Sequence, residues 1–212
     1  MSVDKFQSTT SNNSESQIKI PSDWTTGSKI IFFGIGNVGR QDDGLGIRFI
    51  ESLESIPLPS HIGLEGNYQL NAEDALAISE YDIVVFVDAT MAPQARAPYE
   101  IRAVQPSSEV SFSTHAMSMG SVLAFCQQLY NKRPKAYSLA IPGSAWNMTA
   151  GLSEIMSDSA QANLKATLDS ITSAFQLPPI PHLAPQPESP QPVSSQSVCS
   201  PLVLPKPETP RA

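Results

Sequence analysis

Short, continuously apolar segments constrain the fold of this chain more than any other feature. Three of them are KIIFF, DIVVFV and AYSLAI, at residues 29–33, 82–87 and 136–141. Strands that are apolar almost throughout are buried on both faces, which is typical of a mostly parallel sheet. Two weaker strand patterns lie at 61–66 and 99–104, and the second alternates as a strand near a sheet edge would.

Amphipathic helical patterns alternate with these strands. Apolar residues recur at helical spacing in four segments, at 44–55, 72–79, 117–130 and about 152–175. We expect Asn71 to cap the second helix, and Ser113 or Thr114 to cap the third. The order predicts an α/β fold, a three-layer α/β/α sandwich with a mostly parallel twisted sheet. Right-handed crossovers would bring the loops after the strands to one edge, where open α/β sheets bind ligands.

Composition divides the chain into a folded domain, residues 28–176, and two flanking segments. Residues 1–27 are rich in Ser, Thr, Asn and Gln without apolar periodicity, so we expect a disordered polar segment. Residues 177–212 hold most of the chain's 19 prolines and are expected to form a disordered, proline-rich tail. Such a tail either docks on a partner domain or stays solvated.

Charge, cysteine content and hydropathy restrict the classes of partner. A net charge of −7 argues against nucleic-acid binding, which needs basic patches. The two cysteines, Cys126 and Cys199, indicate neither a disulfide framework nor a thiolate metal site. The first residues lack the apolar stretch of a secretory signal, and no apolar run approaches the roughly 20 residues that span a bilayer. We therefore expect a soluble cytoplasmic protein without membrane insertion.

The segment GIGNVGRQDDGLG, residues 34–46, follows the first predicted strand and allows two interpretations. Its first three glycines have the G-x-G-x-x-G spacing of a dinucleotide-binding loop, which would indicate a nucleotide-dependent oxidoreductase. In such a loop, however, a helix begins directly after the third glycine and faces a pyrophosphate. Here the helical pattern begins only near residue 44, and the carboxylates of Asp42 and Asp43 would repel a pyrophosphate.

The other interpretation makes this segment a turn that presents carboxylates at the edge of the sheet. Gly36 suits a turn backbone, and Asn37 can hydrogen-bond within the loop. Asp42 could cap the helix that starts near Gly44. We assign Gly36, Asn37, Asp42 and Gly44 to support of the loop and Asp43 to the site itself.

Two further residues are expected at the same edge. Asp88 ends the strand 82–87, although it could also serve as a turn or cap residue. His115 lies at the start of a helix, where imidazolium is disfavoured, so it is either a neutral metal ligand or a capping or core histidine. Together Asp43, Asp88 and His115 offer two oxygens and one nitrogen, a set that suits a borderline or hard divalent ion. A serine hydrolase is not indicated, because the chain has no G-x-S-x-G segment.

Four motifs, in this order, resemble those of the maturation endopeptidases of nickel–iron hydrogenases. That family has a G-x-G-N loop followed by D-D/E-G-x-G, a strand ending in V-D-A, a histidine after Ser or Thr that opens a helix, and a late strand followed by a Leu-Ser-Glu helix start. The corresponding segments here are GIGNVGRQDDGLG, FVDAT, STHAMS and LAIPGSAW…GLSEIM, and NYQLNAEDAL also looks like the family. The resemblance covers residues 29 to about 175 and implies an α/β/α sandwich.

The resemblance also implies an activity and a ligand set. By position, Asp43, Asp88 and His115 would bind metal, namely the nickel that the substrate already carries. The implied reaction is removal of a C-terminal extension from the precursor large subunit of a nickel–iron hydrogenase after nickel insertion. The catalytic group stays open between Asp43 and Asp88, as does an aspartic-type or a metal-assisted mechanism. A non-catalytic, nickel-sensing maturation chaperone could use the same three residues, and we expect a monomer.

Overall fold

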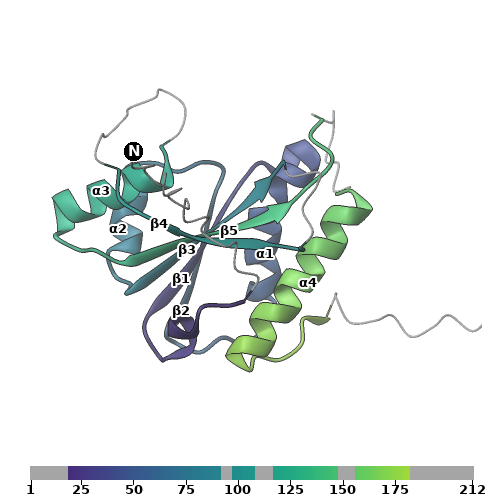
Figure 1. The fold of residues 1–212 in the computed structure, drawn as a ribbon, viewed down its shortest axis with the longest axis horizontal. Helices are drawn as coiled ribbons and strands as arrows, with labels where there is room; N and C mark the ends of the chain where they lie inside the picture. Colours follow the sequence, from purple (N-terminus) through teal and green to yellow (C-terminus); the bar gives the residue numbers. More distant parts are fainter. Residues whose placement is uncertain (1–18, 92–96, 108–116, 148–155, 182–212) are drawn as a thin grey trace, which may run out of the picture.

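The computed structural model describes residues 19–91, 97–107, 117–147 and 156–181 (Figure 1). In this part of the chain a five-stranded sheet has the order β2-β1-β3-β5-β4. β1, β2, β3 and β5 run parallel, and β4 pairs antiparallel with β5 at one edge. The strands are β1 (Ile30–Ile35), β2 (Ile62–Asn67), β3 (Ile83–Thr90), β4 (Glu100–Val104) and β5 (Lys135–Pro142). All five predicted strands are therefore confirmed, including the alternating one at the edge.

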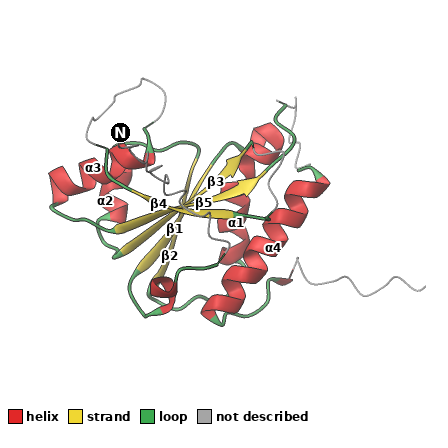
Figure 2. Cartoon of the chain, in the orientation of Figure 1, coloured by secondary structure: helices red, strands yellow, loops and turns green. Residues whose placement is uncertain are grey.

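Helices cover both faces of the sheet, which confirms the predicted three-layer α/β/α sandwich (Figure 2). One face carries α1 and α4, and the other carries α2 and α3 (Figure 1). The helical elements are η1 (Ser22–Thr25), η2 (Val38–Gly44), α1 (Leu45–Glu54), α2 (Asp74–Ile78), α3 (Met119–Tyr130) and α4 (Asp158–Phe175), where η marks a short 3₁₀ helix. Among the described residues, no helix has both the length and the apolar content to cross a membrane.

The central strands are apolar throughout because each contributes to two hydrophobic cores. Phe32 and Val85 pack in the core beneath α1 and α4, whereas Phe33 and Phe86 pack in the core beneath α2 and α3. All four side chains are fully buried. Neighbouring residues of a strand point to opposite faces. A strand that is covered on both faces is therefore apolar at every position, and polar residues do not alternate with apolar ones.

The helix starts differ from the sequence prediction. Ser118 caps α3, and its Oγ accepts a hydrogen bond from the backbone N–H of Ser121. The predicted caps, Ser113 and Thr114, come too early and lie outside the described residues. α4 begins at Asp158 rather than near 152, because the hydroxyl of the preceding residue, Ser157, caps it. The prediction was wrong in both cases because several serines and threonines precede each helix, and local sequence does not choose among them.

The start of α2 is also corrected. The side chain of the predicted cap, Asn71, does not cap α2, because no side chain does. The backbone carbonyl of Asn71 accepts a hydrogen bond from the N–H of Asp74 at 3.3 Å, and its backbone N–H donates to Oδ2 of Asp74 at 2.7 Å. The helix is shorter than predicted because residues 72 and 73 form a turn.

The packed domain extends beyond both predicted boundaries. Trp24, which the sequence places in the polar segment, is fully buried against Phe32 and Tyr137, with ring centroids 5.8 and 5.4 Å apart. Ile180, beyond the predicted end at residue 176, is buried in the same core. Apolar side chains therefore anchor each flank, with Ile20 and Leu177 also packed against this core, although neither segment has apolar periodicity. Residues 1–18 and 182–212 lie outside the described residues.

Candidate functional site

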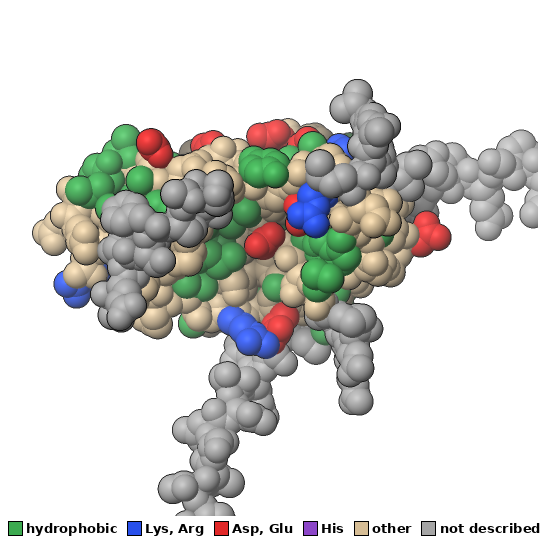
Figure 3. Space-filling model, turned by 90° about the horizontal axis from the view of Figure 1, so that it is seen from above, with side chains coloured by type: hydrophobic (Ala, Val, Ile, Leu, Met, Phe, Trp, Pro, Cys, Tyr) green, Lys and Arg blue, Asp and Glu red, His purple; other side chains and the backbone are tan. Residues whose placement is uncertain are grey.

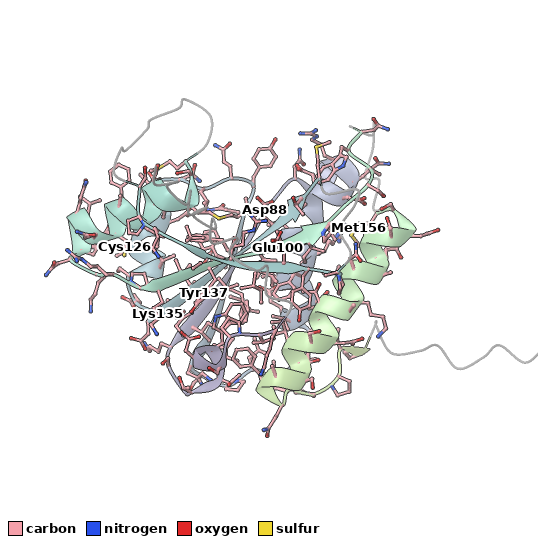
Figure 4. The ribbon with its side chains drawn as sticks, in the orientation of Figure 1. Asp88, Glu100, Cys126, Lys135, Tyr137 and Met156 are labelled. Carbon is pink, nitrogen blue, oxygen red and sulfur yellow. The ribbon has the colours of Figure 1, made fainter. Side chains whose placement is uncertain are left out.

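The structure brings Asp43 and Asp88 to one pocket at the carboxyl edge of the parallel strands. Asp43 lies in η2, directly after β1, and Asp88 lies near the end of β3. Both residues line a pocket of about 580 Å³. In Figure 4, Asp88 lies at the upper edge of the sheet, between the two helical layers. β3 continues to Thr90, so Asp88 lies within the strand, two residues before its end, rather than after it.

The walls of this pocket are mostly apolar and come from three separate segments. They are Ile35 and Gly36 at the end of β1, Tyr68–Leu70 after β2, and Met117–Gly120 at the start of α3. Seen from above, acidic side chains lie on this face with hydrophobic side chains around them (Figure 3). Tyr68 is 64% exposed, which is unusual for so large an aromatic side chain. A partly apolar surface around two carboxylates is suited to binding another polypeptide.

The electrostatics of the pocket affect the protonation of Asp88. Burial raises the pKa of Asp88 to about 6; a hydrogen bond from the N–H of Ala89 opposes this, and the charge of Asp43 adds to it. The Ala89 N–H donates to Oδ1 of Asp88 at 2.7 Å. A carboxyl group with a pKa close to neutral can take up or release a proton at physiological pH.

The glycine loop holds Asp43 in place through its own backbone. Gly36 has a φ of +142°, and a Cβ atom there would overlap the carbonyl oxygen of Asp43. Oδ1 of Asn37 accepts a 2.8 Å hydrogen bond from the N–H of Gly39, and its Nδ2 donates to the Tyr68 hydroxyl at 3.3 Å. The loop is thus tied both to itself and to the apolar wall of the pocket.

The same contacts argue against a dinucleotide loop. The N–H groups of Gly39 and Arg40, which would have to face a pyrophosphate, already donate to the side chain and the carbonyl of Asn37. α1 begins only at Leu45, as the helical pattern predicted. The loop presents a carboxylate to the pocket, where a phosphate would be repelled.

Asp42 faces away from the pocket and is fully buried. Its Oδ2 accepts hydrogen bonds from the N–H groups of Ser144 and Ala145 and from the hydroxyl of Ser157, and its Oδ1 accepts one from the N–H of Ser157. Burial acts to raise the pKa of Asp42, but these hydrogen bonds outweigh it and hold the pKa below its usual value. The alternative that Asp42 caps the following helix is wrong, because no side chain caps α1. Gly44, the other residue assigned to the loop, is buried against Val38.

The third predicted ligand, His115, lies outside the described residues. Met117, two residues further along the chain, lines the pocket. The described part of the chain contains no cluster of three or more His, Cys, Asp or Glu side chains arranged to hold a metal ion. The structure therefore places two of the three predicted ligands together, and the assignment of His115 stays a prediction.

The sequence analysis missed the hydrogen bonds that hold the pocket wall after β2, at Tyr68–Leu70. Asp74, which is buried, accepts hydrogen bonds from Nδ2 of Asn67 at 2.9 Å and from the N–H of Asn71 at 2.7 Å. These bonds close the loop that carries Tyr68 and Leu70 into the pocket. The spacing of Asn, Asn and Asp within NYQLNAEDAL is the signal that could have shown this loop, since such side chains bind nearby backbone.

Solved structures with a similar arrangement identify the fold. The hydrogenase maturating endopeptidase HybD from E. coli matches with a TM-score of 0.53 and 19% identity, over 70% of this chain and 92% of that one. The NiFe hydrogenase maturation protease HycI from Thermococcus kodakarensis matches with a TM-score of 0.55 and 20% identity, over 73% of this chain and 97% of that one. This chain has the fold of the hydrogenase maturation proteases.

A third structure agrees with these two. The hydrogenase 2 maturation peptidase from a Thaumarchaeota archaeon matches with a TM-score of 0.51 and 18% identity, over 71% of this chain and 99% of that one. No family model and no curated protein matches the chain. Each match covers 92% or more of the solved structure, so the shared fold extends over nearly the whole of each of those chains.

Proposed function

We propose that this protein is an endopeptidase that removes a C-terminal extension from the precursor large subunit of a nickel–iron hydrogenase after nickel insertion. The observation that carries the proposal is the pocket shared by Asp43 and Asp88, on the fold of structures named as hydrogenase maturation proteases. The motif resemblance adds His115 to this pair. We expect the protein to act as a monomer in the cytoplasm.

In this proposal nickel belongs to the substrate, which carries it to the pocket. Asp43, Asp88 and His115 would contact the nickel held by the precursor, and oxygen and imidazole donors suit such an ion. That contact would orient the scissile peptide next to the carboxylates, while the apolar walls hold the chain on either side. A precursor without nickel would lack the contact and would not be positioned.

The chemical step is hydrolysis of one peptide bond. A water molecule attacks the carbonyl carbon and loses a proton to a carboxylate, and the departing amine takes up a proton as the C–N bond breaks. In the free pocket Asp88, with a pKa of about 6, is mostly ionised above pH 6, so its carboxylate can accept the proton. Asp43 is the second carboxylate, and either of the two can activate the water.

The proposal is tested with nickel-loaded and nickel-free precursor large subunits from the organism that encodes this chain. After incubation with the full-length protein, mass spectrometry should show loss of one discrete C-terminal peptide from the nickel-loaded form alone. Asp43→Asn should abolish this loss while the circular dichroism spectrum stays native.

Two outcomes would contradict the assignment. If the loaded cognate precursor binds but is never cut, the protein is a nickel-sensing chaperone rather than a peptidase. If Asp43→Asn processes the precursor like the wild type, the pocket is not the active site.

A further inference from the structure

Asp42 joins three segments that are far apart in the sequence. It follows β1, whereas its hydrogen-bond donors lie after β5, at Ser144 and Ala145, and directly before α4, at Ser157. These donors are 102, 103 and 115 residues away along the chain. Four donors on one buried carboxylate satisfy both of its oxygens, and such an arrangement fixes the orientation of the side chain.

The residues beside Asp42 extend this contact. The N–H of Asp42 donates to the Ala145 carbonyl at 3.1 Å. Oε1 of Gln41 accepts from the N–H of Asn147 at 3.0 Å, and Nη2 of Arg40 donates to the carbonyl of residue 146 at 3.4 Å. Residues 40–42 thus bind residues 144–147, and we call this pair of segments the clasp.

Within the clasp, the backbone of Gln41 takes a conformation that non-glycine residues rarely adopt, with φ of 51° and ψ of −115°. Such a conformation persists only where surrounding contacts hold it, and it is found most often near functional sites. Asp42 follows this residue and points into the protein, and Asp43 comes next and lines the pocket. The rare conformation at residue 41 therefore lies directly before the two aspartates, of which one is buried and the other lines the pocket.

We propose that Asp42 is a positioning residue for Asp43: by closing the clasp onto the start of α4, it keeps the Asp43 carboxylate in the pocket beside Asp88. Asp42 itself contacts no substrate. The effect on processing rests on the proposed function, whereas the effect on the loop does not. If Asp42 only stabilised the fold, replacing it would slow processing no more than any other substitution that lowers the free energy of unfolding by the same amount.

The test compares Asp42→Asn with a core variant, Leu168→Ala. The first keeps the size of the side chain but replaces one acceptor oxygen by a donor, which then faces N–H or O–H groups. The second leaves a cavity under α4 at a fully buried residue that does not line the pocket. Both are studied as full chains, at a temperature where circular dichroism shows them folded.

Two readouts are taken for each variant: amide hydrogen exchange by residue, and kcat and KM for the nickel-loaded precursor. For Asp42→Asn we expect the amides of residues 39–45 to exchange about tenfold faster or more, relative to those of β3. We also expect kcat to fall about tenfold to a hundredfold, with a smaller change in KM, since a misplaced reacting group slows the chemical step. Leu168→Ala should alter neither the exchange ratio nor kcat.

Several results would overturn the proposal. It fails if Asp42→Asn leaves the exchange ratio unchanged, or if its kcat equals that of Leu168→Ala. If the wild type processes no precursor, the proposed function fails, and the exchange ratio alone then decides whether Asp42 positions the loop. If Asp42→Asn does not fold, Ser157→Ala replaces it; this variant removes one of the four donors and should shift both readouts in the same direction to a smaller extent.

Discussion

Asp43 lies close enough to Asp88 for its charge to reinforce the effect of burial, and together they raise the pKa of Asp88 to about 6. Two carboxylates in one partly apolar pocket repel each other unless one takes up a proton or a cation lies between them. The folded protein therefore carries an electrostatic cost at this site, and a positively charged group bound by the pocket would relieve it. This relationship leads to two predictions about pH.

Replacing Asp88 by Asn should stabilise the protein at pH 8. The pKa of the Asp88 carboxyl group is about 6 in the folded state and near 3.8 when unfolded, so this group holds its proton more tightly in the folded protein. The cost is present above pH 6 and is relieved as the pH falls from 6 towards 4. From the shift, the gain for Asp88→Asn at pH 8 is on the order of 2 kcal/mol. Urea unfolding at pH 8 and at pH 5 measures it.

The control for this measurement is Glu54→Gln, which removes an exposed carboxylate at the end of α1. It should leave the free energy of unfolding nearly unchanged at both pH values. A destabilised Asp88→Asn at pH 8, or a gain that grows as the pH falls, would contradict the raised pKa.

Binding of the nickel-loaded precursor should weaken below pH 6. A carboxylate must lose its proton to contact a metal ion, so each pH unit below the pKa of Asp88 should weaken binding by up to about tenfold. Titration of the labelled precursor between pH 5 and pH 8 gives the profile. Asp88→Asn should bind more weakly at pH 8 and show less dependence on pH. A wild-type affinity that does not change across this range would mean that Asp88 does not contact the nickel.

The strands, and the location of Asp43 and Asp88 at the carboxyl edge of the sheet, agree with the sequence prediction because their signals are local. Apolar runs such as DIVVFV give the buried strands, and the carboxyl ends of parallel strands meet at one edge wherever each strand ends. Asp88 and Asp43 follow directly from that rule. The sequence alone therefore predicts which residues lie at this edge of the sheet, without any knowledge of side-chain contacts.

The features that were missed depend on contacts between distant residues. The partners of Asp42 lie more than 100 residues away, so no local pattern shows whether its side chain caps a helix or joins loops. Trp24 is an isolated aromatic residue in a polar segment, and hydrophobic periodicity does not detect one anchor. Ser118 caps α3, and beside it the N–H of Met117 donates to the carbonyl of Leu70, in the distant loop between β2 and α2.

Gly36→Ala should destabilise the protein and abolish processing. A Cβ atom at this position would overlap the carbonyl oxygen of Asp43, and the φ of +142° is unfavourable for alanine. The loop must move to remove the overlap, which displaces Asp43. We expect a loss of more than about 1 kcal/mol in the free energy of unfolding. Gly27→Ala is the matched control, because its φ is +86° but no atom lies within 4 Å of the added Cβ. It should share the backbone strain and still process the precursor; equal processing by both variants would contradict the role of the loop.

Tyr68→Ala should weaken binding of the precursor without weakening the fold. Tyr68 is 64% exposed on the wall of the pocket, so its truncation should change the free energy of unfolding by no more than about 0.5 kcal/mol. If the precursor chain packs on this ring, KM should rise about tenfold, since a buried aromatic contact commonly contributes 1 kcal/mol or more. Leu76→Ala, on α2, removes a side chain that is 54% exposed but does not line the pocket, and it should leave KM unchanged. The pair therefore separates a binding surface from ordinary exposed apolar area, and an unchanged KM for Tyr68→Ala would show that the precursor approaches Asp43 and Asp88 from another side.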